Sequence, residues 1–198
     1  MRARLAVAIA AAAVLSLTSA GHAAPAPQVK DPTGDALAAQ AASDIVSVTY
    51  STTGKKVGRK YVADTLVIAM KLAAAPHTSG GTYLYYTRAE VSDCGSFETR
   101  YSPGASSGSG SFFLACGSQN NAATGTSTLI QTNPKVTGSV ITWSMKLRAL
   151  PREIKVGSQW SALSAYTDVV EPFTGILGPG AFGLPLDSAS STKTWKLG

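Results

Sequence analysis

Apolar and polar residues alternate along several short segments of this chain, and this pattern constrains its fold more than any other feature. It is clearest from 141 to 148, where Ile141, Trp143 and Met145 alternate with polar or charged residues. Because successive side chains of a strand point to opposite faces of a sheet, a period of two predicts strands with one buried face. The same pattern predicts strands at 46–50, 66–70, 83–91 and 160–166, and shorter strands at 96–101, 111–116, 126–131 and 192–197.

Segments rich in glycine and serine separate these strands, and no segment carries a sustained helical period. Gly54-Lys55-Lys56 predicts a turn between the first two strands, and 148–154 predicts at most one helical turn. In the segment 160–166 the pattern places Trp160 and Tyr166 on the same face. Many short strands with turn signals between them predict an all-β fold, a single antiparallel β-sandwich of jelly-roll-like type.

The N-terminus has the composition of an export signal. A cationic start with Arg2 and Arg4 is followed by an apolar run over 5–17 and by small residues up to Ala23. We expect cleavage after Ala23, because the apolar run is shorter than the roughly 20 residues that span a bilayer. The sequence therefore predicts a signal peptide at 1–23, an N-terminal extension at 24–43 and a β-sandwich domain at 44–198 that is secreted and has no membrane partner after cleavage.

The net charge and the two cysteines of the mature chain further limit the classes of partner and ligand that we expect for it. Fifteen lysines and arginines face eleven acids, so the net charge is about +4 with histidine neutral. This excess is spread along the sequence, which argues against a nucleic-acid partner and favours anionic surfaces. Cys94 and Cys116 predict a disulfide, because an exported chain meets an oxidising compartment and offers only His77 as a further soft ligand.

An acidic turn lies near the start of the mature chain. Asp31-Pro32-Thr33-Gly34-Asp35 places two acids on either side of a Pro-x-Gly turn, and Asp44 opens the first predicted strand. Carboxylate oxygens gathered around one point suit a hard cation such as Ca²⁺. The alternative is an ordinary turn with solvated aspartates.

The acidic turn, the Ala-rich spacer after it and the strand opening Asp44-Ile45-Val46 together resemble the start of a group of secreted bacterial β-sandwich modules. These modules are the glucodextranase C-terminal domain and carbohydrate-binding module family 9. The resemblance implies a structural calcium ion held by Asp31, Asp35 and Asp44. It also implies Asp187 as a further ligand, because the first and last strands of such folds often pair.

Two motifs associated with enzymes occur without the context that they need. Gly104-Ala105-Ser106-Ser107-Gly108 matches the Gly-x-Ser-x-Gly elbow of hydrolases, which requires a strand before it, a helix after it and a downstream histidine. His77 lies upstream of this motif. The segment 178–183 matches Gly-x-Gly-x-x-Gly, but Pro185 follows where a helix should begin, so we interpret it as a loop. The sequence therefore predicts no catalytic residues.

Tyrosines are concentrated near the predicted disulfide and offer a better argument for binding. Exposed aromatic rings stack on the apolar faces of sugars. We therefore take four tyrosines as candidate ligand-binding residues: Tyr83, Tyr85, Tyr86 and Tyr101. The alternative is packing in the core, which we expect for at least half of them.

Three hypotheses of function follow from these patterns. The first is a secreted, non-catalytic β-sandwich module that is stabilised by calcium and binds carbohydrate or a cell-surface polymer. The second is a secreted interaction or inhibitor protein that presents the disulfide-tethered region 94–116 to a protein partner. The third, which the motifs favour least, is a hydrolase of unfamiliar type.

Overall fold

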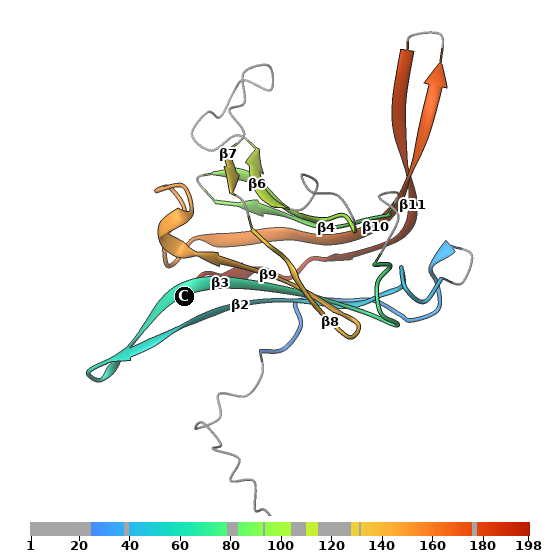
Figure 1. Ribbon diagram of the computed structural model, residues 1–198. Helices are drawn as coiled ribbons and strands as arrows, with labels where there is room; N and C mark the ends of the chain where they lie inside the picture. The colour runs from blue at the N-terminus through green and yellow to red at the C-terminus, as the bar shows by residue number, and fades with distance from the viewer. Residues whose placement is uncertain are drawn as a thin grey trace, which may run out of the picture.

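The protein folds as two antiparallel β-sheets packed face to face (Figure 1). The computed structural model describes residues 25–37, 40–78, 83–92, 94–103, 110–114, 128–130, 132–175 and 178–198. Over these residues the chain is almost entirely strand and turn, with one short 3₁₀ helix, η2, at Leu147–Ala149. The predicted all-β, antiparallel β-sandwich is confirmed.

The first sheet contains five strands in the order β1-β2-β3-β9-β8. These strands are β1 (Val29–Lys30), β2 (Ile45–Val57), β3 (Lys60–Leu72), β9 (Val140–Lys146) and β8 (Lys135–Thr137). Two hairpins, β2–β3 and β8–β9, join side by side through the pairing of β3 with β9. β1 lies within the segment that the sequence assigns to the N-terminal extension, and it pairs with β2 at the edge of the sheet.

The second sheet follows the order β11-β10-β4-β5-β6-β7, and the short β12 also pairs with β10. Its strands are β4 (Tyr83–Val91), β5 (Gly95–Tyr101), β6 (Gly110–Leu114), β7 (Thr128–Ile130), β10 (Gln159–Gly175), β11 (Gly178–Ser191) and β12 (Trp195–Lys196). The chain therefore crosses between the sheets three times, from β3 to β4, from β7 to β8 and from β9 to β10.

Large aromatic residues fill the space between the sheets. Trp143, which the alternation predicts to be a core residue, is fully buried, as are Trp160 and Phe97. The rings of Trp160 and Phe97 meet edge to face with their centroids 4.8 Å apart. The indole Nε1 of Trp143 donates a hydrogen bond to the carbonyl of Arg100 at 3.0 Å. This bond links β9 of one sheet to β5 of the other and satisfies the polar atom that the buried ring carries.

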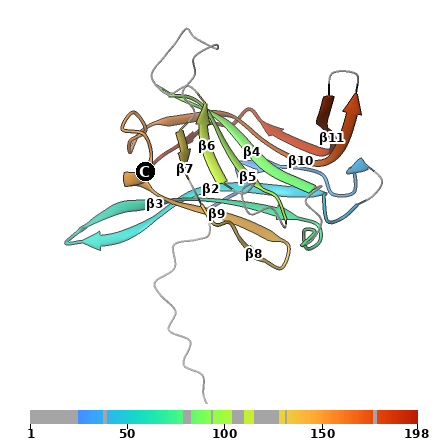
Figure 2. The same ribbon diagram turned by 45° about the horizontal axis from the view of Figure 1, so that its top comes forward.

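The first hairpin is longer than the sequence suggests, and the predicted turn at 54–56 is wrong. The chain reverses at Gly58, whose φ of +60° suits a residue without a side chain. At Gly54 the ladder instead shifts register, and the backbone carbonyl of Val62 approaches so closely that no side chain could fit there. Glycine suits a bulge of this kind and also suits a tight turn, so the residue type alone does not show which of the two forms. The resulting ribbon projects from the body in both views (Figures 1 and 2).

A second irregularity lies in β10 and corrects the predicted alternation of 160–166. The ladder with β4 shifts between Ser161 and Ser164, and Ala162 adopts a positive φ of 47°. Trp160 is therefore fully buried, whereas Tyr166 lies on the opposite, outer face and is partly exposed. A bulge inserts one residue and inverts the facing of everything that follows it.

The predicted loop at 178–183 is also wrong, because these residues belong to β11 and pair with β10. β11 is the edge strand of its sheet. An edge strand tolerates proline, since its outer N–H groups have no partner to lose. The glycines and prolines of 178–183 therefore indicate a loop, although pairing with the long strand β10 makes this segment a strand.

Several predictions fall on residues outside the described ranges. The signal peptide at 1–23, the serine motif around Ser106 and Cys116 all lie there. Cys94 is buried, and the described residues contain no free cysteine, but the Cys94–Cys116 pairing stays a prediction. Within the described ranges no helix has the length and apolar character needed to cross a bilayer.

Candidate metal centre

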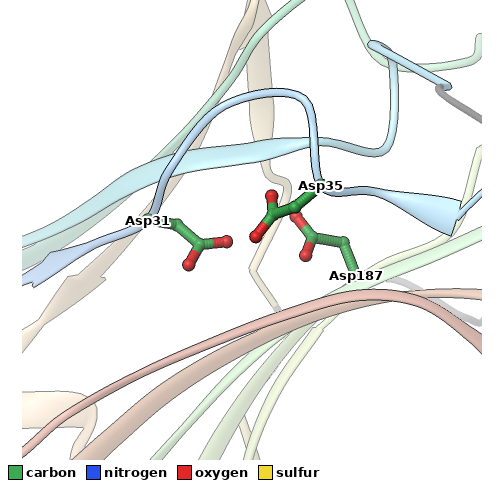
Figure 3. A group of neighbouring side chains, drawn as sticks. All are labelled: Asp31, Asp35 and Asp187. Atoms are coloured by element: carbon green, nitrogen blue, oxygen red, sulfur yellow. The ribbon is translucent and has the colours of Figure 1, made fainter.

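Three aspartate side chains converge at one edge of the sandwich (Figure 3). Asp31, Asp35 and Asp187 each direct one carboxylate oxygen to a common point, and these oxygens lie within 4.8 Å of one another. Asp31 follows β1, Asp35 lies in the loop before β2, and Asp187 comes from β11 of the other sheet. Asp31 and Asp187, which are 156 positions apart in the sequence, thus share one small volume.

The fourth predicted ligand, Asp44, lies beside this group and positions part of it. Its Oδ2 accepts a hydrogen bond from the backbone N–H of Gly34 at 2.6 Å. Gly34 has a φ of +93°, a conformation that favours glycine and reverses the chain between Asp31 and Asp35. Asp44 is 4% exposed and its Oδ1 has no hydrogen-bond partner. The buried carboxylate therefore fixes the turn that brings the two flanking acids together.

Asp187 is held by the backbone on both of its oxygens. Oδ2 accepts from the N–H of Ile45 at 2.6 Å, and Oδ1 accepts from the N–H of Ser188 at 2.7 Å. The bond to Ile45 connects β11 to the first residue of β2, across the two sheets. Asp187 does not arrive through pairing of the first and last strands, as the resemblance suggests, because β1 and β11 belong to different sheets.

The segment before β2 is anchored to the second sheet by two further side chains. Thr167 of β10 donates its hydroxyl to the carbonyl of Ser43 at 2.6 Å. Tyr85 of β4 donates to the carbonyl of Ala42 at 3.2 Å and accepts from the N–H of His77 at 3.1 Å. The segment before β2 is thus tied to the second sheet by hydrogen bonds from buried groups, which lowers the freedom of the loop that carries Asp35.

The carboxylates of this group are like charges that lie close together. Burial, together with the smaller effect of the neighbouring charges of Asp187, Asp35 and Asp44, raises the pKa of Asp31 to about 6. The pKa of Asp187 is also raised, chiefly by burial, although its two backbone hydrogen bonds oppose the change. Among the described residues no lysine or arginine forms an ion pair with these aspartates.

The donor set suits a hard cation. Every side-chain donor is a carboxylate oxygen, which matches the preference of Ca²⁺ for several oxygen ligands, and the three converging residues include no nitrogen or sulfur donor of the kind that Zn²⁺ favours. Oδ2 of Asp31 is buried without a hydrogen-bond partner, as Oδ1 of Asp44 is. A depression of about 320 Å³ lies against Asp35 and Asp187 and gives the group access to solvent. Backbone carbonyls and water would complete the coordination shell.

The four predicted tyrosines do not form one surface. Tyr85 is fully buried and its hydroxyl is occupied by the contacts to Ala42 and His77, so it belongs to the core and cannot stack on a ligand. Tyr83 stacks on His77 with the ring centroids 3.7 Å apart, and Tyr101 packs 5.8 Å from Tyr85. Tyr83 and Tyr101 are only partly buried against the core. Tyr85 is a structural residue of the core and not the binding residue that the sequence predicts.

Tyr86 alone of the four lies on the outer face of the second sheet, where it has partners that the sequence does not reveal. Its ring stacks on that of Tyr166 at 5.0 Å, and its hydroxyl donates to Asp168 at 2.9 Å. The guanidinium of Arg88 lies 5.3 Å from the centre of the Tyr86 ring. The pair depends on the alignment of β4 with β10, strands about 80 residues apart, so no local pattern could have predicted it.

We compared the chain with models of protein families, with curated proteins and with solved structures, and none of these comparisons finds a match. The resemblance to the glucodextranase C-terminal domain and to carbohydrate-binding module family 9 therefore stays a prediction.

Proposed function

We propose that this protein is a secreted, non-catalytic β-sandwich module that is stabilised by a calcium ion and binds carbohydrate or a cell-surface polymer. The ion would be held by Asp31, Asp35 and Asp187, with Asp44 beside them. Its role would be structural, because the site joins the segment before β2 to β11 at the edge of the fold.

The observation that carries the proposal is a group of converging carboxylates with which no lysine or arginine of the described residues forms an ion pair. Coulomb repulsion between like charges a few ångströms apart disfavours a compact arrangement unless a proton or a metal ion intervenes. Solvated aspartates of an ordinary turn would point away from one another. Here they point toward one another, and two of the oxygens at the site are buried without a hydrogen-bond partner (Figure 3).

The test is the thermal stability of the mature protein in chelator and in increasing calcium. Because calcium would bind the folded state, we expect a gain of about 2.7 kcal/mol at a concentration 100 times the dissociation constant. For a chain of this size that gain corresponds to a rise in Tm of about 5–10 °C. Magnesium should act more weakly, since it demands a stricter octahedral geometry and releases water reluctantly.

Two variants separate a specific site from a general effect of charge. Asp35→Asn should abolish most of the rise in Tm, because Asp35 converges on the site and no backbone donor is recorded for its side chain. Asp64→Asn is the matched control, since it removes one exposed acid that lies outside the group and pairs with Lys146 instead. Identical melting curves in chelator and in millimolar calcium would reduce the cluster to an ordinary turn.

The alternative of a protein-interaction module that uses the region 94–116 stays a prediction. Residues 104–109 and 115–127 lie outside the described ranges, so this structure adds no observation in its favour. Co-purification with a protein partner would support that alternative, and binding to a glycan array would support the carbohydrate-binding role.

A further inference from the structure

The outer face of the first sheet carries lysines that are separated in the sequence. Buried residues such as Val48, Met70 and Ile141 define the inner side of β2, β3 and β9, so the residues between them point outward. Lysines occupy outward positions on four of the five strands: Lys30 on β1, Lys71 on β3, Lys135 on β8 and Lys146 on β9. All four are exposed.

Hydroxyl side chains occupy most of the outward positions between these lysines. β2 contributes Ser47, Thr49, Ser51 and Thr53 in alternation, while β8 and β9 contribute Thr137, Thr142 and Ser144. The register aligns Ser47 with both Lys30 and Lys71, and it aligns Thr142 with Lys135. The face therefore combines cations with rows of groups that can both donate and accept hydrogen bonds.

The cations of this face are mostly uncompensated. Asp64, at the end of the face, accepts from Lys146 at 3.3 Å. No other ion pair is recorded for these four lysines within the described residues. The outer face of the second sheet differs, because its arginines Arg88 and Arg100 both bind the carboxylate of Glu98. Lysines that are scattered in the sequence thus gather on the outer face of the first sheet.

The basic surface continues along the projecting β2–β3 ribbon. Lys55, Lys56, Arg59 and Lys60 are all exposed near its tip. Where the ribbon joins the sheet, Lys55, Lys146 and Arg148 line a depression of about 460 Å³ together with Asp64. The cations therefore extend from the sheet face along the ribbon, a layout that suits an extended ligand.

We propose that the outer face of the first sheet binds an acidic polysaccharide, with lysines contacting its carboxylates and the serine and threonine hydroxyls contacting its sugar hydroxyls. Charge complementarity selects an anionic ligand. The hydroxyl rows favour a sugar chain over a nucleic acid, because the outward positions of the sheet named above include no aromatic ring on which a base could stack. The exposed ring of Tyr61 lies outside these rows, on the ribbon beside Lys56. This inference rests on the binding role proposed above but not on the calcium site.

The experiment compares carboxymethyl-dextran with unmodified dextran, two polymers that share a backbone and differ in their carboxylates. We expect the mature protein to bind the first and not the second, with an affinity that falls as salt screens the exposed lysines. The triple variant Lys30→Gln, Lys71→Gln, Lys135→Gln should bind about tenfold more weakly, since each exposed ionic contact contributes a few-fold at most. Calcium concentration is held constant throughout.

The matched control is Lys155→Gln, Lys193→Gln, Lys196→Gln, which removes the same charge from exposed positions outside this face. Equal losses in both triple variants would overturn the proposal, because net charge alone would then explain binding. Equal binding of both polymers, or no binding of either, would overturn it as well. Tighter binding to duplex DNA or to phosphatidylglycerol vesicles would assign the face to a different partner and reject the polysaccharide.

A variant without a change in charge tests the hydroxyl rows. Thr142→Val keeps the β-branched shape that the strand favours and removes one hydroxyl. We expect about a threefold loss of affinity for carboxymethyl-dextran, the effect of one hydrogen bond, with an unchanged Tm. Unchanged affinity would reject the hydroxyl contacts and with them the preference for a sugar chain. The response of Tm to calcium, measured on the same samples, reports the proposed metal centre separately.

Discussion

The carboxylate of Glu98 and the group formed by Asp31, Asp35 and Asp187 are stabilised in opposite ways. On the second sheet, Glu98 is 1% exposed and receives hydrogen bonds from the guanidinium groups of Arg88 at 2.7 Å and Arg100 at 2.8 Å. Its hydrogen bond raises the pKa of Arg88. At the edge of the sandwich, Asp31, Asp35 and Asp187 face one another. Asp187 accepts hydrogen bonds from the backbone N–H groups of Ile45 and Ser188, and Oδ2 of Asp31 is buried without a hydrogen-bond partner.

The comparison shows how the charge of a carboxylate that is removed from bulk water can be compensated. Glu98 has two cations within its own fold, so its charge is compensated without any ligand. The aspartate group lacks an internal cation among the described residues, and the pKa of Asp31 rises to about 6 as a result of burial and of its neighbours. A bound external cation would compensate the negative charge of the aspartates, as the two arginines compensate the charge of Glu98.

The largest effect is expected from Asp187→Ala. This change leaves the N–H of Ile45 without its acceptor at a buried position and removes a calcium ligand. We expect a loss of about 3 kcal/mol in calcium, because an orphaned buried donor costs about 1–3 kcal/mol and the linkage to calcium is lost in addition. Urea unfolding with and without calcium measures both parts. Stability equal to that of the wild type would contradict the role of Asp187 in joining the two sheets.

A smaller loss is expected from Glu98→Gln, and it should not depend on calcium. The substitution leaves two guanidinium groups without a counter-charge, but the side chains of Arg88 and Arg100 are 53% and 38% exposed and water compensates them in part. The cost should therefore be about 2 kcal/mol, below the value for a fully buried pair. Melting curves should shift equally in calcium and in chelator. A reduced calcium response in this variant would mean that the two groups are coupled.

The pH dependence of the metal-free protein should reveal the raised pKa of Asp31. Because its pKa in the folded state, about 6, exceeds the unfolded value of 3.8, the folded state binds more protons between these limits. The contribution of Asp31 to stability should therefore be largest below pH 4 and fall as the pH rises to 6, by about 1–2 kcal/mol after allowance for solvent screening. Asp31→Asn should flatten this part of the curve, whereas Asp64→Asn should leave it unchanged.

Calcium should show the opposite trend, since protons and the metal compete for the same oxygens. The rise in Tm at a fixed calcium concentration should be larger at pH 7 than at pH 5. A response that is independent of pH would separate calcium binding from the group that contains Asp31.

The fold could be predicted largely from the sequence because most strands keep one face in the core. β4 and β9 have a strict alternation and lie where it places them. The failures arise where pairing overrides composition. The bulge at Ala162 leaves no sign in the sequence, and β11 is a strand despite its glycines and prolines because β10 provides a long partner.

The candidate functional residues likewise divide into those that a local pattern predicts and those that only strand pairing brings together. Asp31 and Asp35 could be found because they flank one local turn, and Asp44 because it opens the next strand. Tyr86 and Tyr166 meet through pairing of distant strands, and the lysines of the first sheet gather only when five strands align. Local clusters can be read from a sequence, whereas surfaces built across strands depend on a register that the sequence does not display.

The smallest effect, and the most specific, is expected from Gly34→Ala. Gly34 has a φ of +93° with no atom within 4 Å of the position that a Cβ would take, so the substitution adds backbone strain without a clash. That strain costs about 1–2 kcal/mol and shifts the turn that places Asp35. Gly58→Ala is the matched control, because Gly58 has a φ of +60° and equally open surroundings at the tip of the β2–β3 ribbon.

Both glycine variants should lose similar stability in chelator, as measured by thermal melting. Only Gly34→Ala should also lose part of the rise in Tm that calcium produces, because only this turn carries a proposed ligand. If the two variants respond equally to calcium, the turn does not position Asp35 for the metal. The acidic edge would then resemble the Glu98 group in having no need of an external cation.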